Sequence, residues 1–169
     1  MRKSEFYREA RRDLPGPLAG VRVLEATSTW AGPMCGCVLA DFGADVVKVE
    51  PPGGEVARRL PPALPGTQTS ALHATVNRNK RSVTLDLGAP RGRELFLRLA
   101  AGADVVIENF RPGTLERLGL GYPDLRAMNE DVILVSISGF GQFGSQSERA
   151  GYDPLAQAAS GFLSLNGDP

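Results

Sequence analysis

Short apolar runs alternate with amphipathic stretches along this chain, and the alternation predicts its secondary structure. β-Branched runs and one alternating segment indicate strands at 21–27, 45–50, 82–86, 105–107 and 131–138. The intervening patterns predict helices at about 34–42, 70–76, 90–101, 115–120, 123–128 and 154–165. Regular alternation of strands and helices predicts an α/β fold with a parallel sheet, beginning with a right-handed β-α-β unit.

Polar and aromatic residues follow the predicted strand at 105–107. Asn109, Phe110, Arg111 and Arg117 fall where that strand ends and the next helix begins. Ligands of open α/β sheets bind outside the carboxyl ends of the strands. An amide, an aromatic face and two guanidinium groups suit a nucleotide with phosphates. A solvated loop accounts for the same residues, and position alone leaves both interpretations open.

The turn after the first strand lacks the G-x-G-x-x-G fingerprint, because Ala31-Gly32-Pro33 supplies one glycine and a proline. A standard dinucleotide site of the dehydrogenase type is therefore not expected. The glycine-aromatic segment 139–144 is either a mobile lid or a surface loop. Asp153 is expected to cap the last helix, with Pro154 in its first turn.

The charge balance narrows the choice of partners. The 169 residues include 19 Lys and Arg and 19 Asp and Glu, a net charge of zero. This argues against bulk nucleic acid or an anionic membrane as the main partner. Residues 1–17 form a charged arm with no apolar core, and no run approaches the roughly 20 apolar residues of a membrane span. We therefore expect a cytoplasmic protein that binds neither nucleic acid nor membrane.

Metal chemistry is not expected from these residues. Cys35 and Cys37 are spaced C-x-C, so on a helix they point to different faces, and no second pair completes a zinc site. His73 has no partner at ligand spacing. The basic cluster at 78–81 suits a solvated loop better than a phosphate site on spacing alone.

Six ordered motifs carry a resemblance to a known family. They are LAGVRVLE (18–25), AGP (31–33), ADFGADVVKVEPPGG (40–54), NKRSVTLDL (79–87), ENFRPG (108–113) and SGFGQ (138–142). Together they resemble the class III CoA-transferases, the family of formyl-CoA transferase, carnitine CoA-transferase and α-methylacyl-CoA racemase. The resemblance implies a Rossmann-like large domain, a smaller second domain and an interlocked dimer. Family members are longer, so 18–169 corresponds to an incomplete large domain, with the second domain absent.

The resemblance also implies a coenzyme A site with no metal. The residues that match the family's CoA contacts are Leu85, Asn109, Phe110 and Arg117, while Trp30 and Ala31 fall beside the acyl end. The family often has basic residues where this chain has Pro51 and Gly88. Phosphate contacts are then expected from nearby cations, among them Arg78, Lys80, Arg81 and Arg111. Tyr152 completes the expected site, and it replaces a histidine of the racemase branch, which favours transferase over racemase.

In the family, an aspartate attacks the acyl-CoA thioester and forms an aspartyl intermediate before CoA passes to a carboxylic acid. By the resemblance this aspartate falls beyond Pro169, and Asp168 comes too early to be it. The chain alone is therefore expected to be inactive and to pair with a C-terminal half or to act within a longer homodimer. Two alternatives stay open: one subunit of a split CoA-transferase, and a non-catalytic CoA-binding or assembly module.

Overall fold

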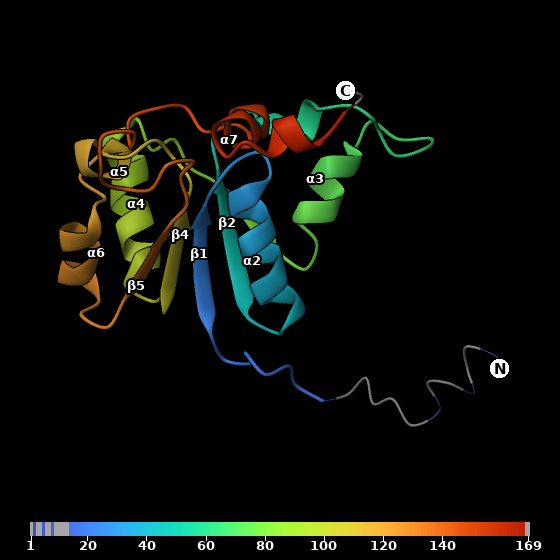
Figure 1. Cartoon of the computed structure of the whole chain (residues 1–169). Coiled ribbons are helices and arrows are strands. Elements are labelled where there is room, and N and C mark those ends of the chain that lie inside the picture. Colours follow the sequence, from blue (N-terminus) through green and yellow to red (C-terminus); the bar gives the residue numbers. More distant parts are fainter. Residues whose placement is uncertain (1, 3–4, 6–7, 9–13, 168–169) are drawn as a thin grey trace.

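A five-stranded parallel sheet forms the centre of the computed structural model, which describes residues 2, 5, 8 and 14–167 (Figure 1). Most of the predicted charged arm, residues 1–17, lies outside the described residues. The strands are β1 (Arg22–Ala26), β2 (Asp45–Glu50), β3 (Arg81–Thr84), β4 (Val105–Glu108) and β5 (Ile133–Ser136). Their order is β3-β2-β1-β4-β5, and all four pairings are parallel. The order reverses between β1 and β4, which is where ligands bind in sheets of this kind.

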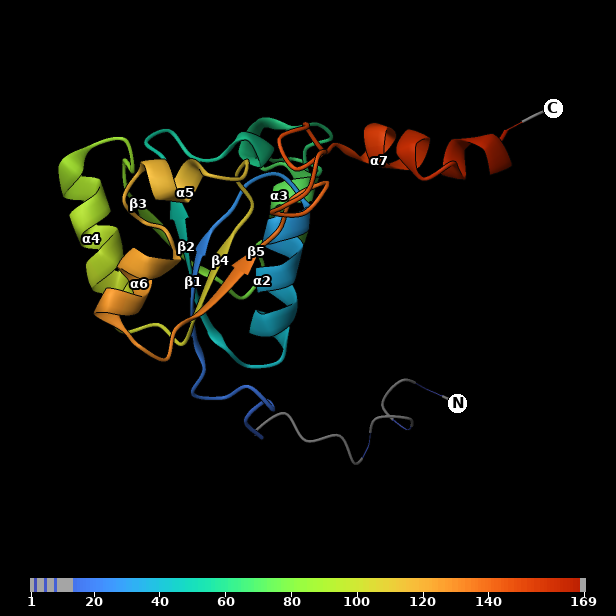
Figure 2. The same ribbon diagram turned by 60° about the vertical axis from the view of Figure 1, so that its left-hand side comes forward.

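Helices cover both faces of the sheet (Figures 1 and 2). One face carries α2 (Ala31–Asp41) and α3 (Ala71–Val76), and the other carries α4 (Pro90–Ala100), α5 (Thr114–Arg117) and α6 (Tyr122–Met128). The expected parallel α/β fold is confirmed. The observed elements differ from the predicted ones mainly at their ends, where local patterns carry least information.

Neighbouring residues of β1 enter opposite cores, because successive side chains of a strand alternate between its two faces. Val23 packs in a layer with Ala40, Val46 and Ile107 under α2. Leu24 packs in the other layer, with Phe96 from α4. This double burial explains why apolar side chains stand on both faces of the central strands, as Val46 and Val49 do on β2.

A buried ion cluster interrupts the core on the α2 side. The Glu25 carboxylate lies 2.9 Å from Lys48 Nζ and 2.7 Å from Lys80 Nζ, and all three side chains are almost fully buried. Lys48 Nζ also donates to the carbonyl of Thr27 at 2.9 Å, and Lys80 Nζ donates to the carbonyl of Pro33 at 2.7 Å. Burial lowers the pKa of Lys80, and the neighbouring Glu25 opposes that shift. The cluster thus fastens β1, β2 and the first turn of α2 together.

The prediction of a solvated loop at 78–81 was wrong for Lys80, whose side chain is buried, whereas Arg78 and Arg81 are exposed as predicted. Lys80 is the buried member of the ion cluster, while Arg78 pairs with Asp41 and Arg81 with Asp45. Each cation faces a carboxylate that is distant in sequence. The local pattern of charges contains no information about these partners.

The C-terminal helix also differs from its prediction. It ends as α7 (Asp153–Ala159), and Gly161, with φ of 78°, separates it from a short 3-10 helix, η2 (Phe162–Leu165). Asp153 does not cap α7: the N-cap is Tyr152, with no side-chain bond, and Asp153 accepts instead from Gln157. Figure 2 shows this segment projecting from the sheet and its covering helices.

Within the described part of the chain, no helix has the length and apolar character needed to cross a membrane.

Candidate functional site

A cleft of about 400 Å³ opens at the carboxyl edge of the sheet, over the ends of β1, β2 and β3. We call it the carboxyl-edge cleft. Its position follows from the topology, because loops leaving parallel strands at one edge diverge around the point where strand order reverses. It is lined by Ala26, Thr27, Ser28, Val49, Glu50, Pro51, Gly54, Glu55, Val56, Leu85, Asp86, Leu87, Gly88, Phe110 and Leu118.

The lining combines apolar side chains with three carboxylates, and each carboxylate has partners within the fold. Glu50 accepts from Arg58 at 2.5 and 2.6 Å and from Ser82 at 2.6 Å. The hydrogen bonds from Arg58 lower the pKa of Glu50 to about 2. Asp86 accepts from the backbone N–H of Gly88 at 2.9 Å. The carboxylates therefore form part of the cleft walls, and their oxygens accept hydrogen bonds from neighbouring groups of the protein.

Glu50 should make stability depend on pH in acid. Its folded pKa of about 2 lies below the ordinary 4.5, so its contribution is present above pH 4.5 and is lost as the pH falls toward 2. Glu50→Gln should therefore flatten the loss of unfolding free energy between these pH values. Denaturant unfolding at several pH values measures the slope, with the exposed Glu94→Gln as the matched control. An unchanged slope in Glu50→Gln would show that Arg58 does not perturb Glu50 in solution.

The turn between β1 and α2 is held to the end of β4 by an amide clamp. The backbone N–H of Ser28 donates to Asn109 Oδ1 at 2.8 Å, and Asn109 Nδ2 donates to the Ser28 carbonyl at 2.9 Å. Gly32 packs so closely that a Cβ there would lie 2.6 Å from Thr27 and 2.8 Å from Asn109. The single glycine of this turn is therefore required by packing against the clamp.

The structure brings two of the predicted site residues into the carboxyl-edge cleft. Leu85 follows β3 and Phe110 follows β4, and both line it while also packing against the core. Asn109 stands next to Phe110, but both polar atoms of its amide bind Ser28. Asn109 thus lies at the end of β4, where the sequence predicted it, next to the reversal of strand order. Its observed hydrogen bonds, however, are to the backbone of Ser28.

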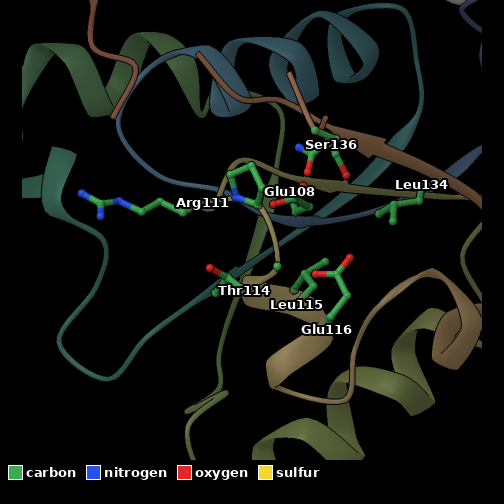
Figure 3. Close-up of a pocket in the computed structure, with 10 residues that line it drawn as sticks. Glu108, Arg111, Thr114, Leu115, Glu116, Leu134 and Ser136 are labelled. Carbon is green, nitrogen blue, oxygen red and sulfur yellow. The ribbon is translucent and has the colours of Figure 1, made fainter. Parts of the chain in front are cut away.

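Arg111 lies on the turn before α5, and Arg117 is the last residue of α5. Arg111 lines a smaller pocket with Glu108 and Ser136, and Figure 3 shows its side chain extending away from both of them. Burial raises the pKa of Glu108, which accepts from the Phe110 backbone N–H at 2.8 Å. Arg117 is exposed and donates to Thr114 Oγ1 at 2.9 Å. Both guanidinium groups are thus near Phe110 in sequence but do not line the carboxyl-edge cleft.

The remaining predicted residues do not line the cleft either. Trp30, which is 57% exposed, is the N-cap residue of α2, and the exposed Ala31 is the first residue of this helix. Tyr152 is exposed at the start of α7. Arg81 opens β3 at the amino edge of the sheet, opposite the cleft, and pairs there with Asp45 at 2.6 Å. The structure therefore does not place Arg81 at this site, because a strand's first and last residues lie at opposite edges.

Glu55 is a cleft residue that the sequence analysis missed. Its side chain is almost fully buried, and Oε2 accepts from the backbone N–H groups of Thr29 at 3.0 Å and Ala57 at 3.1 Å. Its Oε1 lies 3.1 Å from His73 Nδ1. A carboxylate after Gly53-Gly54 looks solvent-exposed by sequence, and only the fold reveals its partners.

Among the residues that the structure describes, no group of three or more histidine, cysteine or acidic side chains is arranged to hold a metal ion. Cys35 and Cys37 are free thiols, and burial raises the pKa of each.

Comparison with known proteins decides the family. The model of CoA-transferase family III matches residues 18–169. The chain belongs to this family. Succinyl-CoA–D-citramalate CoA-transferase of Chloroflexus aurantiacus is 46% identical over 92% of this chain and 39% of its own length. Succinate–glutarate CoA-transferase of Agrobacterium fabrum is 47% identical over 93% of this chain and 42% of its own length.

The fold of this family III chain agrees with a solved relative. A CAIB/BAIF family protein from Brucella suis superposes with a TM-score of 0.86 at 45% identity, over 92% of this chain and 42% of that chain. The resemblance drawn from the six motifs is therefore confirmed, and so is the mostly parallel α/β fold. The chain spans about two-fifths of the length of the relatives it matches.

Proposed function

We propose that this chain binds coenzyme A across the carboxyl edge of its sheet, as part of an enzyme that moves CoA from an acyl-CoA to a carboxylic acid. The observation that carries the proposal is the carboxyl-edge cleft of a family III fold, lined by Leu85 and Phe110. Their apolar surfaces suit the base or the pantetheine arm of CoA. Arg111 and Arg117, on the loop and helix that follow Phe110, supply positive charge for phosphates at the rim.

The proposed reaction exchanges acyl partners in balanced steps. An aspartate carboxylate attacks the thioester carbon and expels the CoA thiolate, which leaves a mixed anhydride. The thiolate then attacks the aspartyl carbonyl, releases the first carboxylate and forms an aspartyl-CoA thioester. The acceptor carboxylate then attacks the aspartyl-CoA thioester, expels the CoA thiolate and forms a second mixed anhydride. The thiolate attacks the acceptor carbonyl of this anhydride, which gives acceptor-CoA and the free aspartate. One difficult step is thereby divided into several easier ones. We place this aspartate after Pro169.

The substrates of named relatives suggest an acyl donor and acceptors for the first assays. Several relatives carry succinyl-CoA in their names, together with citramalate, glutarate or malate. These acceptors are all dicarboxylic acids, so we propose a short dicarboxylic acid as the acceptor class for this chain. Tyr152, where the racemase branch has a histidine, supports transfer over racemisation.

The relatives also bear on the partner. The alpha and beta subunits of succinyl-CoA–L-malate CoA-transferase of Chloroflexus aurantiacus match this chain over 36% and 38% of their own lengths. Each of those subunits therefore contains a counterpart of about 90% of this chain. They are not an N-terminal and a C-terminal half, so we favour pairing between two long chains over a split enzyme. We retain a cytoplasmic location as part of the proposal.

The purified 169-residue chain should show no CoA transfer from succinyl-CoA to glutarate, malate or citramalate, because the nucleophile lies outside it. Chromatographic detection of the acceptor-CoA thioester measures this, with the Agrobacterium relative as the positive control. Adding that relative's C-terminal remainder should restore transfer if the halves associate. Turnover by the chain alone would contradict the placement of the aspartate. CoA binding without turnover after a stable complex forms would favour the non-catalytic module.

A further inference from the structure

The two walls of the carboxyl-edge cleft are joined through one buried carboxylate. Glu55 stands on the loop after β2, and Ser28, on the turn after β1, lines the cleft beside it. Glu55 Oε2 accepts from the backbone N–H of Thr29, the residue next to Ser28, at 3.0 Å. The same oxygen accepts from Ala57 at 3.1 Å, which anchors the carboxylate to its own loop.

The backbone that Glu55 holds is strained. Thr29 has φ of 70°, a left-handed conformation that is a genuine outlier for a β-branched residue. Such conformations persist only where the surrounding structure over-determines them, and they cluster at ligand sites. Two side chains hold this backbone in place: Asn109 binds both backbone groups of Ser28, and Glu55 accepts from the N–H of Thr29. Two side chains from different loops therefore fix consecutive residues of one turn.

That turn orients the start of α2. Trp30 and Ala31 follow Thr29 directly, and Trp30 is more than half exposed. Without the hydrogen bond from its N–H to Glu55, Thr29 would relax toward negative φ. This change of backbone conformation would move its two chain neighbours, Ser28 in the cleft wall and Trp30 at the start of α2. We propose that Glu55 is a positioning residue for the CoA site, acting by accepting the Thr29 N–H rather than by touching the ligand. This proposal rests on the proposed function.

The proposal requires the hydrogen-bond acceptor of Glu55 and not its negative charge, so two substitutions can test it. In Glu55→Gln one oxygen remains to accept from Thr29 and Ala57, while the contact with His73 Nδ1, which also lies 3.0 Å from Asn77 Nδ2, becomes that of a neutral amide. In Glu55→Ala every one of these bonds is lost. We expect Glu55→Ala to weaken CoA binding about tenfold, as for a buried donor left unsatisfied, and Glu55→Gln to stay within about twofold of wild type. Adding Thr29→Gly to Glu55→Ala should recover affinity, because glycine adopts positive φ without strain.

The experiment combines calorimetric titration with CoA and acrylamide quenching of Trp30, the single tryptophan of the chain. Glu94→Ala, an exposed carboxylate on α4 that pairs with Arg91, is the matched control. Without CoA, Glu55→Ala should increase Trp30 quenching, and Glu55→Gln and Glu94→Ala should not. Because quenching is read without CoA, it still tests Glu55 if wild type fails to bind CoA, a result that would instead remove the proposed function.

Three results would overturn the proposal. The first is a folded Glu55→Ala with unchanged Trp30 quenching and unchanged CoA affinity. The second is an equal loss of CoA affinity in Glu55→Ala and Glu55→Gln, which would show that the charge of Glu55 matters and not its acceptor oxygen. If Glu55→Ala does not fold, hydrogen exchange of wild type decides. The Thr29 amide should then exchange at least about tenfold more slowly than in an unfolded chain, and unprotected exchange would overturn the proposal.

Discussion

Replacing Glu25 with alanine should destabilise the fold by about 3–5 kcal/mol, because it leaves buried charges without their counter-ion. Lys48 and Lys80 both bind this carboxylate, and the side chains of all three are at most 2% exposed. Two ammonium groups would then share the interior of the sheet with only neutral acceptors. The space around Glu25 is also closed on the α2 side, since a Cβ at Gly36 would lie 1.8 Å from its Oε2.

Urea unfolding of wild type and Glu25→Ala measures this effect. Glu94→Ala removes an exposed carboxylate whose pair with Arg91 should contribute less than about 1 kcal/mol, so it serves as the control. Lys80→Met in the Glu25→Ala background should recover part of the loss, because it removes one of the two unpaired cations. A loss in Glu25→Ala no greater than in Glu94→Ala would show that the cluster is not needed to hold β1, β2 and α2 together.

Phe110→Ala should reduce CoA affinity by about tenfold to a hundredfold, the range expected when a base loses its aromatic partner. Phe110 reaches the carboxyl-edge cleft from the end of β4 and packs against the core with its remaining surface. The substitution should therefore lower stability as well, so affinity is measured by calorimetry at a temperature where both proteins are folded.

The matched control for this substitution is Phe143→Ala. Phe143 is 88% exposed on the loop between β5 and α7 and lies outside the cleft lining. Removing it should leave CoA affinity unchanged. Equal affinities of wild type and folded Phe110→Ala would move the CoA site away from this cleft.

Local sequence patterns predict the sheet well, and they place two of the expected site residues at the edge where the cleft lies. The strand at 45–50 was predicted with the ends it has, because its apolar run is bounded by Gly43 and Pro51. The placement of Leu85 and Phe110 at the carboxyl edge followed from strand direction together with the family motifs. Both kinds of signal are local in sequence, and the parallel topology then brings the strand ends together.

Long-range polar contacts could not be predicted in the same way. Lys48 stands within a strand whose neighbours gave no sign that its partner is Glu25 of β1. Asn109 suggested a ligand contact, and its amide instead clamps Ser28. Arg81 followed a family motif, yet its place at the beginning of β3 sets it at the far edge of the sheet. In each case the partner lies more than twenty residues away, where periodicity carries no information.

Thermal unfolding of the chain with and without excess CoA tests the central claim most directly. A ligand present at 100 times its dissociation constant adds about 2.7 kcal/mol to the stability of a folded binder. We predict a cooperative transition that moves to higher temperature with CoA in wild type and moves much less in Phe110→Ala. A cooperative transition that CoA leaves in place would contradict a CoA site in this part of the protein.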